Sequence, residues 1–358
     1  MKTGVFLGAG AAAADGAPLQ GGLFRDYFKR LQGSGGHGFS HNSDRELMTF
    51  FNLMFGLDLY NDNLDAITFP TFEEVLGLID LAVARGEGFR DFELINMASN
   101  SGRLHFVRLY LIILMAKSLK DSLEASATNY HLDFVTNLRT ASLLDDIVFF
   151  SANYDLLLDN ALITVLSKPG GPGPIDYAVE FCEPDSWTTI SSPAIPLYKV
   201  HGSLNWMYCP VCNTLRYTPL EKGIVALYEN PHLGACLKCE SVYQPLIVPP
   251  TVFKNMANPF LTAIWQRAER ALRDIQHLVF CGYSFPDADL HVKYLLKRVQ
   301  TSAHALRQVT VLNHYPGKRA VQAKEEESRF KRFLGNSVDF AKASFTDLAA
   351  NPSRYIFP

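Results

Sequence analysis

TGVFLGAG, residues 3–10, opens the chain's α/β pattern. The short, mainly apolar run at residues 3–7 leads directly into a turn of Gly8, Ala9 and Gly10. A strand that enters a glycine turn is typical of the start of a nucleotide-binding α/β domain, because glycine lets a ligand approach the backbone and the following helix offers N–H groups to a diphosphate. The turn therefore predicts a diphosphate site, although a plain tight turn between strand and helix would have the same sequence.

The alternation of strand and helix returns in the second half of the chain. Short apolar runs predict strands at 147–150, 197–200, 278–281 and 309–312. Apolar residues at helical spacing predict helices that follow at 154–167, 260–273, 288–298 and 320–333. Such alternation predicts an α/β fold, a Rossmann-like parallel sheet with helices on both faces.

A block without evident strands interrupts this alternation at residues 44–144, and we predict a helical insertion there. The length of 358 residues suggests two domains, or one domain that carries an insertion. We therefore assign residues 1–43, 145–202 and 246–358 to the Rossmann-like domain, and residues 203–245 to a small module that contains four cysteines.

Composition excludes several classes of protein. With 48% hydrophobic and 19% charged residues, the chain is globular rather than disordered or fibrous. A net charge of −3 gives no overall basic field, so nucleic acid is not expected as a direct substrate. The longest apolar run, residues 109–116, is too short to span a membrane, and glycines interrupt the N-terminal segment that loosely resembles a secretory signal. We expect a cytoplasmic protein without a membrane partner.

Four of the six cysteines form two Cys-x-x-Cys pairs, Cys209 with Cys212 and Cys236 with Cys239. Each pair presents two thiolates on one side of a turn, so the two pairs together suit a tetrahedral zinc site. Four cysteine ligands leave no open coordination position, which predicts a structural zinc ion in a small zinc ribbon. Disulfide bonds between these cysteines are the alternative.

Small or polar residues follow each predicted strand. Because ligands of open parallel sheets bind outside the carboxyl ends of the strands, these residues are candidates for a binding site. They are Ser151, Asn153 and Asp155, then His201 and Gly202, then Gly282, Tyr283 and Ser284, and last Asn313 and His314. The plainer alternatives are that the first three cap the next helix and that the histidine is a core residue.

These elements, in this order, resemble the sirtuin superfamily, whose members consume NAD and combine a Rossmann-like domain with a zinc ribbon and a helical module. The resemblance covers most of the chain outside the helical block and implies that the Rossmann-like domain binds NAD. It implies that Asn153 orients the nicotinamide ribose or an attacking water, that Asp155 contacts the nicotinamide amide, and that His201 is a general base. Contacts to the phosphates and the adenosine ribose are implied for Gly282, Ser284 and Asn313.

The chain also departs from the sirtuin pattern. Ala12 replaces a serine of the turn, the loop at residues 17–21 lacks the usual Asp and Arg, and Ala152 replaces the Gln before Asn153. Two prolines at residues 249–250 remove backbone donors that would pair with an acyl-lysine peptide in a deacylase. In these respects the chain is more similar to bacterial sirtuin-like proteins that destroy NAD in antiviral defence.

The resemblance therefore implies an NAD glycohydrolase that produces nicotinamide and ADP-ribose, assembled as a homo-oligomer and activated by a defence-system partner such as an ATPase. Nicotinamide leaves NAD as a neutral molecule, so the general acid that ordinary glycoside hydrolysis needs is not required. A histidine base and an asparagine that places the water are sufficient. An NAD-dependent protein deacylase and a non-catalytic sensor of NAD or ADP-ribose are the alternatives.

Overall fold

The computed structural model describes residues 2–33, 42–94, 102–167, 173–182, 190–218, 234–236, 238–248, 258–302, 306–314 and 317–356. These residues form two compact units. The helical unit comprises residues 18–124, and the α/β unit comprises the described residues before 18 and after 124. Every residue predicted to bind a ligand or a metal belongs to the α/β unit.

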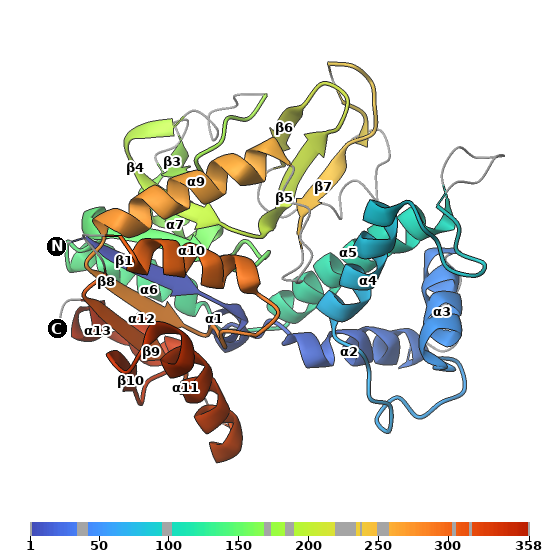
Figure 1. Cartoon of the computed structure of the whole chain (residues 1–358), viewed down its shortest axis with the longest axis horizontal. Helices are drawn as coiled ribbons and strands as arrows, with labels where there is room; N and C mark the ends of the chain where they lie inside the picture. The colour runs from blue at the N-terminus through green and yellow to red at the C-terminus, as the bar shows by residue number, and fades with distance from the viewer. Residues whose placement is uncertain are drawn as a thin grey trace. The chain divides into compact units, whose positions relative to one another are not determined.

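A seven-stranded parallel sheet forms the centre of the α/β unit (Figure 1). From edge to edge its strands are β10 (Val338–Ala341), β9 (Gln308–Leu312), β8 (His277–Cys281), β1 (Thr3–Leu7), β2 (Ile147–Ser151), β4 (Ile190–Lys199) and β3 (Gly173–Asp176). The chain first builds the sheet on the β2 side of β1 and then returns to the β8 side, so the strand order reverses at β1. The predicted Rossmann-like parallel sheet is confirmed.

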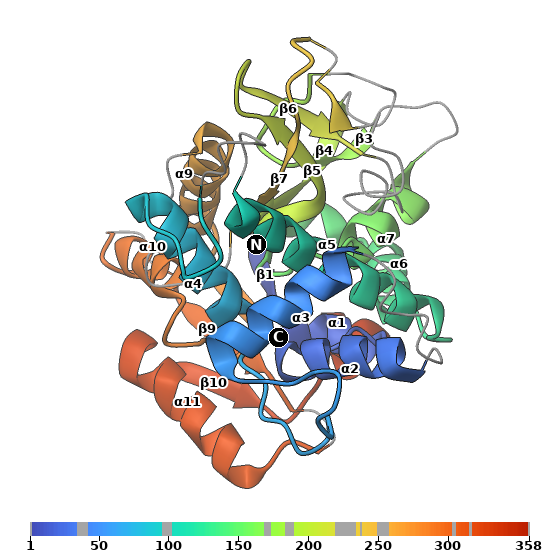
Figure 2. The same ribbon diagram turned by 90° about the vertical axis from the view of Figure 1, so that its right-hand side faces the viewer.

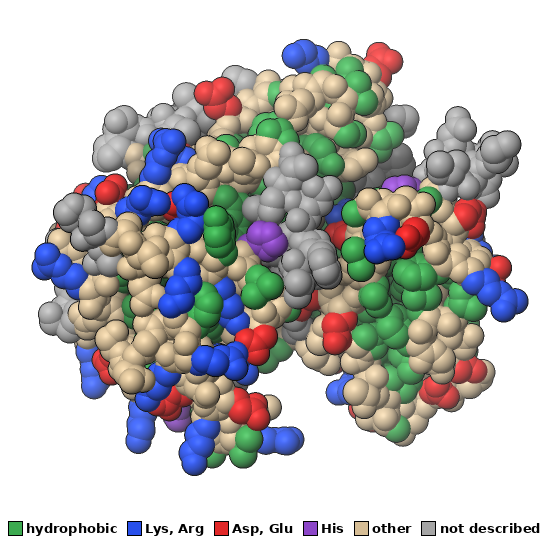
Figure 3. Space-filling model, viewed as in Figure 1, with side chains coloured by type: hydrophobic (Ala, Val, Ile, Leu, Met, Phe, Trp, Pro, Cys, Tyr) green, Lys and Arg blue, Asp and Glu red, His purple; other side chains and the backbone are tan. Residues whose placement is uncertain are grey.

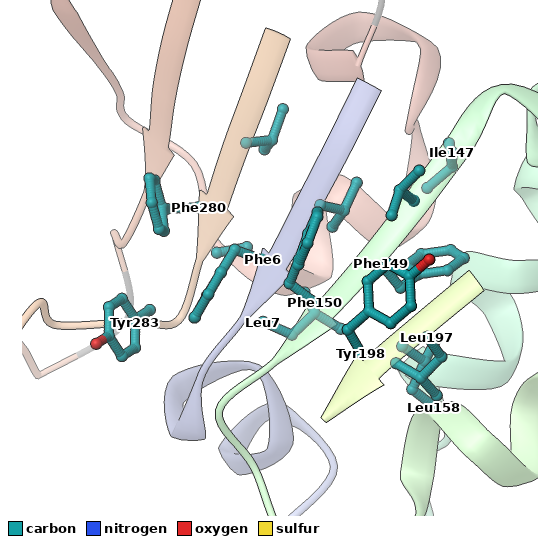
Figure 4. Close-up of a cluster of buried hydrophobic side chains, with 14 of the residues drawn as sticks. Phe6, Leu7, Ile147, Phe149, Phe150, Leu158, Leu197, Tyr198, Phe280 and Tyr283 are labelled. Carbon is teal, nitrogen blue, oxygen red and sulfur yellow. The ribbon is translucent and has the colours of Figure 1, made fainter. Parts of the chain in front are cut away.

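A row of aromatic side chains crosses the middle of the sheet (Figure 4). Phe280, Phe6, Phe150 and Tyr198 are register partners on four adjacent strands, so they point to the same face. Their ring centroids are 5.2, 6.3 and 5.7 Å apart in that order. Tyr283, just after β8, extends the row with its ring 4.8 Å from that of Phe6. The core of the sheet therefore runs directly into the loop that follows β8.

Helices cover both faces of this sheet (Figures 1 and 2). Phe280 contacts Phe330 of one helix layer at 5.3 Å between ring centroids, and Phe149 contacts Phe134 of the other at 6.2 Å. The first layer contains α9 (Pro259–Asp274), α10 (Leu290–Gln300) and α11 (Ala320–Leu334), and the second contains α6 (Tyr130–Thr140), α7 (Leu157–Leu166) and α12 (Phe345–Ala350). The shorter elements of the unit are α1 (Ala9–Ala14), η2 (Leu144–Asp146) and α13 (Ser353–Ile356).

The helical unit is held together by an aromatic cluster. The ring of Phe51 lies 4.8 Å from that of Phe24 and 5.6 Å from that of Phe28. Its helices are α2 (Gln20–Gly33), α3 (Asn42–Phe55), α4 (Phe72–Arg85) and α5 (Arg103–Glu124). A capping box starts α4, where the Thr71 hydroxyl accepts from the Glu74 N–H and the Glu74 carboxylate accepts from the Thr71 N–H. The described residues of this unit form no strand beyond an isolated bridge between Phe89 and Phe92.

A second, three-stranded antiparallel sheet carries the cysteines of the α/β unit. Its central strand β5 (Gly202–Cys209) lies between β6 (Thr214–Tyr217) and β7 (Gln244–Ile247). The sequence did not predict these strands, for two physical reasons. Almost every residue of β5 is buried, so the strand shows no apolar–polar alternation, and its register with β7 shifts between Gly202 and Met207.

The helical unit and the segment assigned to the helical insertion have different limits. The helical unit includes α2, which lies within the segment 1–43, whereas α6 belongs to the α/β unit. At the start of α6, the Asp15 carboxylate accepts from the N–H groups of Tyr130 and His131 at 2.5 and 3.1 Å. The division into an NAD-binding domain, a helical insertion and a zinc ribbon remains a prediction.

Candidate functional site

The carboxyl ends of five adjacent parallel strands lie level with one another. The residues paired at this level, from β9 through β8, β1 and β2 to β4, are Leu312, Cys281, Leu7, Ser151 and Lys199. Neighbouring strands are about 4.8 Å apart. Every predicted site residue other than the cysteines lies no more than four residues after one of these strand ends. They therefore gather at one edge of the sheet, where the strand order reverses and where α/β folds bind ligands.

The glycine turn makes a close backbone contact with the loop after β8. The Gly10 N–H donates to the Gly282 carbonyl at 2.8 Å, and the Gly8 N–H donates to the Cys281 carbonyl at 3.0 Å. A Cβ on Gly8 would lie 2.7 Å from the Gly282 oxygen, and a Cβ on Gly282 would lie 2.1 Å from the Ala11 nitrogen. Backbone packing thus requires these glycines, whether or not a diphosphate binds beside them.

Asn153 and Asp155 lie in the loop between β2 and α7, and both are buried. The Asn153 side chain donates from Nδ2 to the Gly8 carbonyl at 3.0 Å, which joins this loop to the glycine turn. The Asp155 carboxylate accepts from the N–H of Leu157, the first residue of α7, at 3.0 Å, while the N-cap position itself is Leu156 and has no side-chain cap. Asp155 thus contacts the first turn of its own helix, whereas the Asn153 side chain bridges two strand ends.

His201 follows the end of β4 and is 1% exposed. Its Nε2 lies 3.0 Å from Oδ2 of Asp289, and the Tyr283 hydroxyl donates to the same oxygen at 2.7 Å. The rings of Tyr154 and Trp265 each have their centroids 6.5 Å from that of the imidazole. Burial agrees with the explanation that His201 is a core residue. The imidazole differs from a purely apolar core side chain, however, because it contacts a buried carboxylate.

Sequence reasoning did not assign Asp289 to the site. The residue stands directly before α10, 0% exposed, and 88 positions along the chain from His201. The one signal was its place in the segment Gly-Tyr-Ser-x-x-Asp-x-Asp at residues 282–289. That segment holds two acidic residues, and only the fold shows which one turns inward, since the Asp287 side chain is 66% exposed.

Asn313, after β9, is buried in a polar cluster. Its Nδ2 donates to the Tyr283 carbonyl at 2.7 Å and to the Glu326 carboxylate at 2.5 Å, while Lys318 pairs with the same carboxylate at 2.9 Å. Both amide protons are therefore engaged, and its Oδ1 has no hydrogen-bond partner among the described residues. Ser284, by contrast, is exposed, and Arg329 donates to its carbonyl.

The start of β5 carries further polar atoms that the sequence did not single out. Within the part of the chain that the structure describes, Ser203 Oγ and both amide atoms of Asn205 have no hydrogen-bond partner, and both residues are 0% exposed. The Leu204 N–H donates to the Tyr154 carbonyl at 3.0 Å, so this part of β5 lies beside the loop of Asn153. Buried polar atoms are costly without a partner, so this segment would be stabilised by an ordered water or a ligand group.

The four cysteines of the two pairs come together at the end of the second sheet. All four Sγ atoms lie within 4.8 Å of one another, with 3.4 Å between Cys209 and Cys239 and 3.5 Å between Cys212 and Cys236. Tetrahedral zinc with Zn–S bonds of about 2.3 Å places its sulfurs about 3.8 Å apart, so the cluster fits that ion. None of the six cysteines forms a disulfide bond in the structure.

Backbone donors favour the thiolate form within this cluster. Although burial raises the pKa of the Cys236 thiol, hydrogen bonds from the Lys238 and Cys239 N–H groups lower it to about 5. Hydrogen bonds from the backbone and hydroxyl of Ser241 lower the pKa of Cys239. Because the thiolate is the metal ligand, these contacts prepare Cys236 and Cys239 for a cation. Although a hydrogen bond with Thr214 lowers the pKa of Cys212, burial and the neighbouring thiols raise it to about 11, so this thiol gives up its proton when a cation binds.

The helix layer of α9, α10 and α11 exposes many Lys and Arg side chains (Figure 3). Several are paired with carboxylates, such as Arg298 with Glu269 at 3.0 Å and Arg332 with Asp287 at 2.9 Å. This face is therefore partly neutralised rather than uniformly basic. Among the described residues, no helix is long and apolar enough to cross a membrane.

Comparison with known proteins identifies one matching family. Residues 147–334 match the family model described as a SIR2-like domain. No curated protein sequence matches the chain significantly.

The solved structures that resemble this one include Sir2 proteins. Sir2Tm bound to a propionylated peptide is 10% identical, with 99% of this chain and 92% of that chain covered and a TM-score of 0.41. A complex of a Sir2 homologue with NAD is 12% identical, with 99% and 89% covered and a TM-score of 0.41.

Proposed function

Because the chain belongs to the family of SIR2-like domains, we propose that it is an NAD glycohydrolase that cleaves NAD to nicotinamide and ADP-ribose. The observation that carries the proposal is the level register of the strand ends, Leu7 with Ser151 and Ser151 with Lys199. This register brings the loops of Asn153 and His201 to the same edge of the sheet as the glycine turn. A dinucleotide laid across that edge would meet all three.

The proposed roles follow from the chemistry of each side chain. His201 accepts a proton from a ribose hydroxyl or from the attacking water, and Asn153 places that water or the ribose at the glycosidic carbon. The neutral nicotinamide departs without a general acid. Asp155 faces the nicotinamide end of the ligand, while contacts to the phosphates and the adenosine ribose fall to Gly8, Ala9, Gly10, Gly282, Ser284 and Asn313.

We propose a structural zinc ion at Cys209, Cys212, Cys236 and Cys239, supported by the distances between their sulfur atoms. When bound, the ion would cross-link the second sheet. We also propose that a homo-oligomer and a partner in antiphage defence, such as an ATPase, activate the enzyme. That part rests on the resemblance of the sequence alone, and residues 249–254, whose prolines argue against peptide pairing, lie outside the described residues.

The test is release of nicotinamide from NAD by the purified chain, both alone and after enforced oligomerisation. We expect release by the wild type and its loss in Asn153→Ala and His201→Ala. His105→Ala is the matched control, because it removes an exposed histidine of α5 that has no role in the proposed site. No release under any of these conditions, or undiminished release by His201→Ala, would contradict the proposal.

The same assay separates the alternatives. Acceleration of NAD consumption by an acetyl-lysine peptide would indicate a deacylase. Tight binding of NAD or ADP-ribose without turnover, unaffected by Asn153→Ala, would indicate a sensor.

A further inference from the structure

The contact between His201 and Asp289 lies outside the roles assigned so far. Both side chains are almost fully buried, at 2% and 1% exposed. The Asp289 oxygen that meets Nε2 of the imidazole also accepts from the Tyr283 hydroxyl. Tyr283 is fixed in turn by its ring contact with Phe6 in the aromatic row of the sheet. A chain of contacts thus connects the core to the histidine.

A carboxylate in this place has two consequences for the imidazole. An ionised carboxylate only accepts hydrogen bonds, so neutral His201 carries its proton on Nε2 and its lone pair on Nδ1. When the imidazole takes a second proton, the neighbouring negative charge stabilises the imidazolium, more strongly in a buried setting than in water.

We propose that Asp289 is a positioning residue that fixes the tautomer and orientation of His201 and stabilises its protonated form, and that Tyr283 moderates this effect by sharing the same oxygen. The effect of Asp289 on catalysis rests on the proposed function, in which His201 is the general base. The effect of Asp289 on the tautomer and protonation of the imidazole is independent of that function.

The other charged or titratable groups on the elements around His201 are Tyr154, Asp155, Lys199, Asp287, His291 and Lys293. The Tyr154 hydroxyl donates to the Val248 carbonyl, Asp155 accepts from the Leu157 N–H, and the His291 ring lies 6.2 Å from that of Trp265. Lys199 pairs with Asp159, and Lys293 pairs with Asp287. Substitution of Asp289 therefore leaves these pairs in place.

Three variants isolate the contact. Asp289→Asn removes the charge and keeps the size of the side chain. Asp287→Asn is the matched control, since it removes a carboxylate of the same loop that pairs with Lys293 and Arg332 instead. Tyr283→Phe keeps the packed ring and removes the hydroxyl that donates to Asp289.

The measurement is an NMR titration of the His201 imidazole, assigned by the signal that disappears in His201→Gln, together with the pH profile of nicotinamide release. We expect Asp289→Asn to lower the pKa of His201 by about one to two units. Tyr283→Phe should raise that pKa by a smaller amount, because the carboxylate then has one donor less. Asp287→Asn should leave it unchanged. Loss of kcat in Asp289→Asn should reach about 10²- to 10⁴-fold, the usual contribution of a positioned general base, with KM changed little.

An unchanged His201 pKa in a folded Asp289→Asn variant would overturn the proposal. So would a shifted pKa with an unchanged kcat and pH profile. If Asp289→Asn does not fold, the His201 pKa in Tyr283→Phe becomes the test. A His201 pKa that does not rise in this variant would contradict the proposal. Absence of NAD cleavage by the wild type would reject the proposed function, while the titration would still decide what Asp289 does to the imidazole.

Discussion

Gly282 has no side chain because its neighbours leave no room for one. Its φ of +69° lies in the left-handed region, and the backbone of residues 10 and 11 would be within 3 Å of a Cβ. Two costs therefore add at this position, the strain of the dihedral angle and a clash with backbone atoms that no side-chain movement can relieve.

Gly282→Ala should consequently be much more destabilising than Gly86→Ala. Gly86 ends α4 with a similar φ of +72°, but a Cβ on this residue would have no other atom within 4 Å. We expect about 1–2 kcal/mol of lost stability for Gly86→Ala from the dihedral strain alone, and about 1–3 kcal/mol more for Gly282→Ala. Urea unfolding measures both, and equal losses would contradict the packing described here.

At the scale of elements, a buried ion pair joins β4 to α7. Lys199 Nζ lies 3.0 Å from Asp159 Oδ2, the two side chains are 1% and 2% exposed, and the Tyr177 hydroxyl donates to the other carboxylate oxygen at 2.7 Å. A buried pair contributes little net stability compared with apolar residues of the same size, but the loss of one partner leaves a charge buried alone.

Lys199→Met should therefore cost about 3–5 kcal/mol of unfolding free energy, and the double variant Lys199→Met with Asp159→Leu should cost less than the single one. Chemical denaturation of the three proteins gives the comparison. A double variant less stable than the single would show that the pair itself is strongly stabilising.

The stability of the second sheet depends on the ionisation of its cysteines. The pKa of Cys236, lowered from 9.0 to about 5, means that its thiolate stabilises the fold fully above pH 9 and that this contribution is lost as the pH falls toward 5. We expect the purified protein to contain zinc, to release it as the pH falls through this range or below, and to lose it in Cys236→Ser. Cys182→Ser, an exposed cysteine outside the cluster, is the control. Metal analysis that finds no zinc, or equal zinc in both variants, would contradict the assignment.

At the scale of the whole molecule, the helical unit leaves and re-enters the α/β unit at neighbouring points. The Thr128 hydroxyl donates to the Ala14 carbonyl at 3.3 Å, and Asp15 accepts from the backbone of Tyr130. Contacts within the α/β unit thus hold both ends of the helical segment.

Replacement of residues 18–124 by a short Gly/Ser linker should therefore leave the α/β unit folded. We expect the shortened protein to unfold in one cooperative thermal transition, recorded by circular dichroism. A shortened protein without such a transition would show that the α/β unit needs the helical unit to fold.

The sequence was sufficient for the parallel sheet and the cysteine cluster, and insufficient for contacts set by long-range packing. β1, β2 and β8 are buried throughout, so each reads as a continuous apolar run between turns. β5 is equally buried but follows a shifted register and has polar residues, so it resembles no simple pattern. The pairing of His201 with Asp289 depends on β4 and the start of α10 meeting across the fold, which local sequence does not encode.

A crystal structure of the His201→Ala variant with NAD tests the central claim most directly, because this variant should bind the substrate without consuming it. We predict that the glycosidic carbon of the nicotinamide ribose lies beside Asn153 and the space left by the removed imidazole, with the diphosphate near the turn of Gly8. NAD bound elsewhere on the chain, or oriented with its adenine at residues 153 and 201, would contradict this claim.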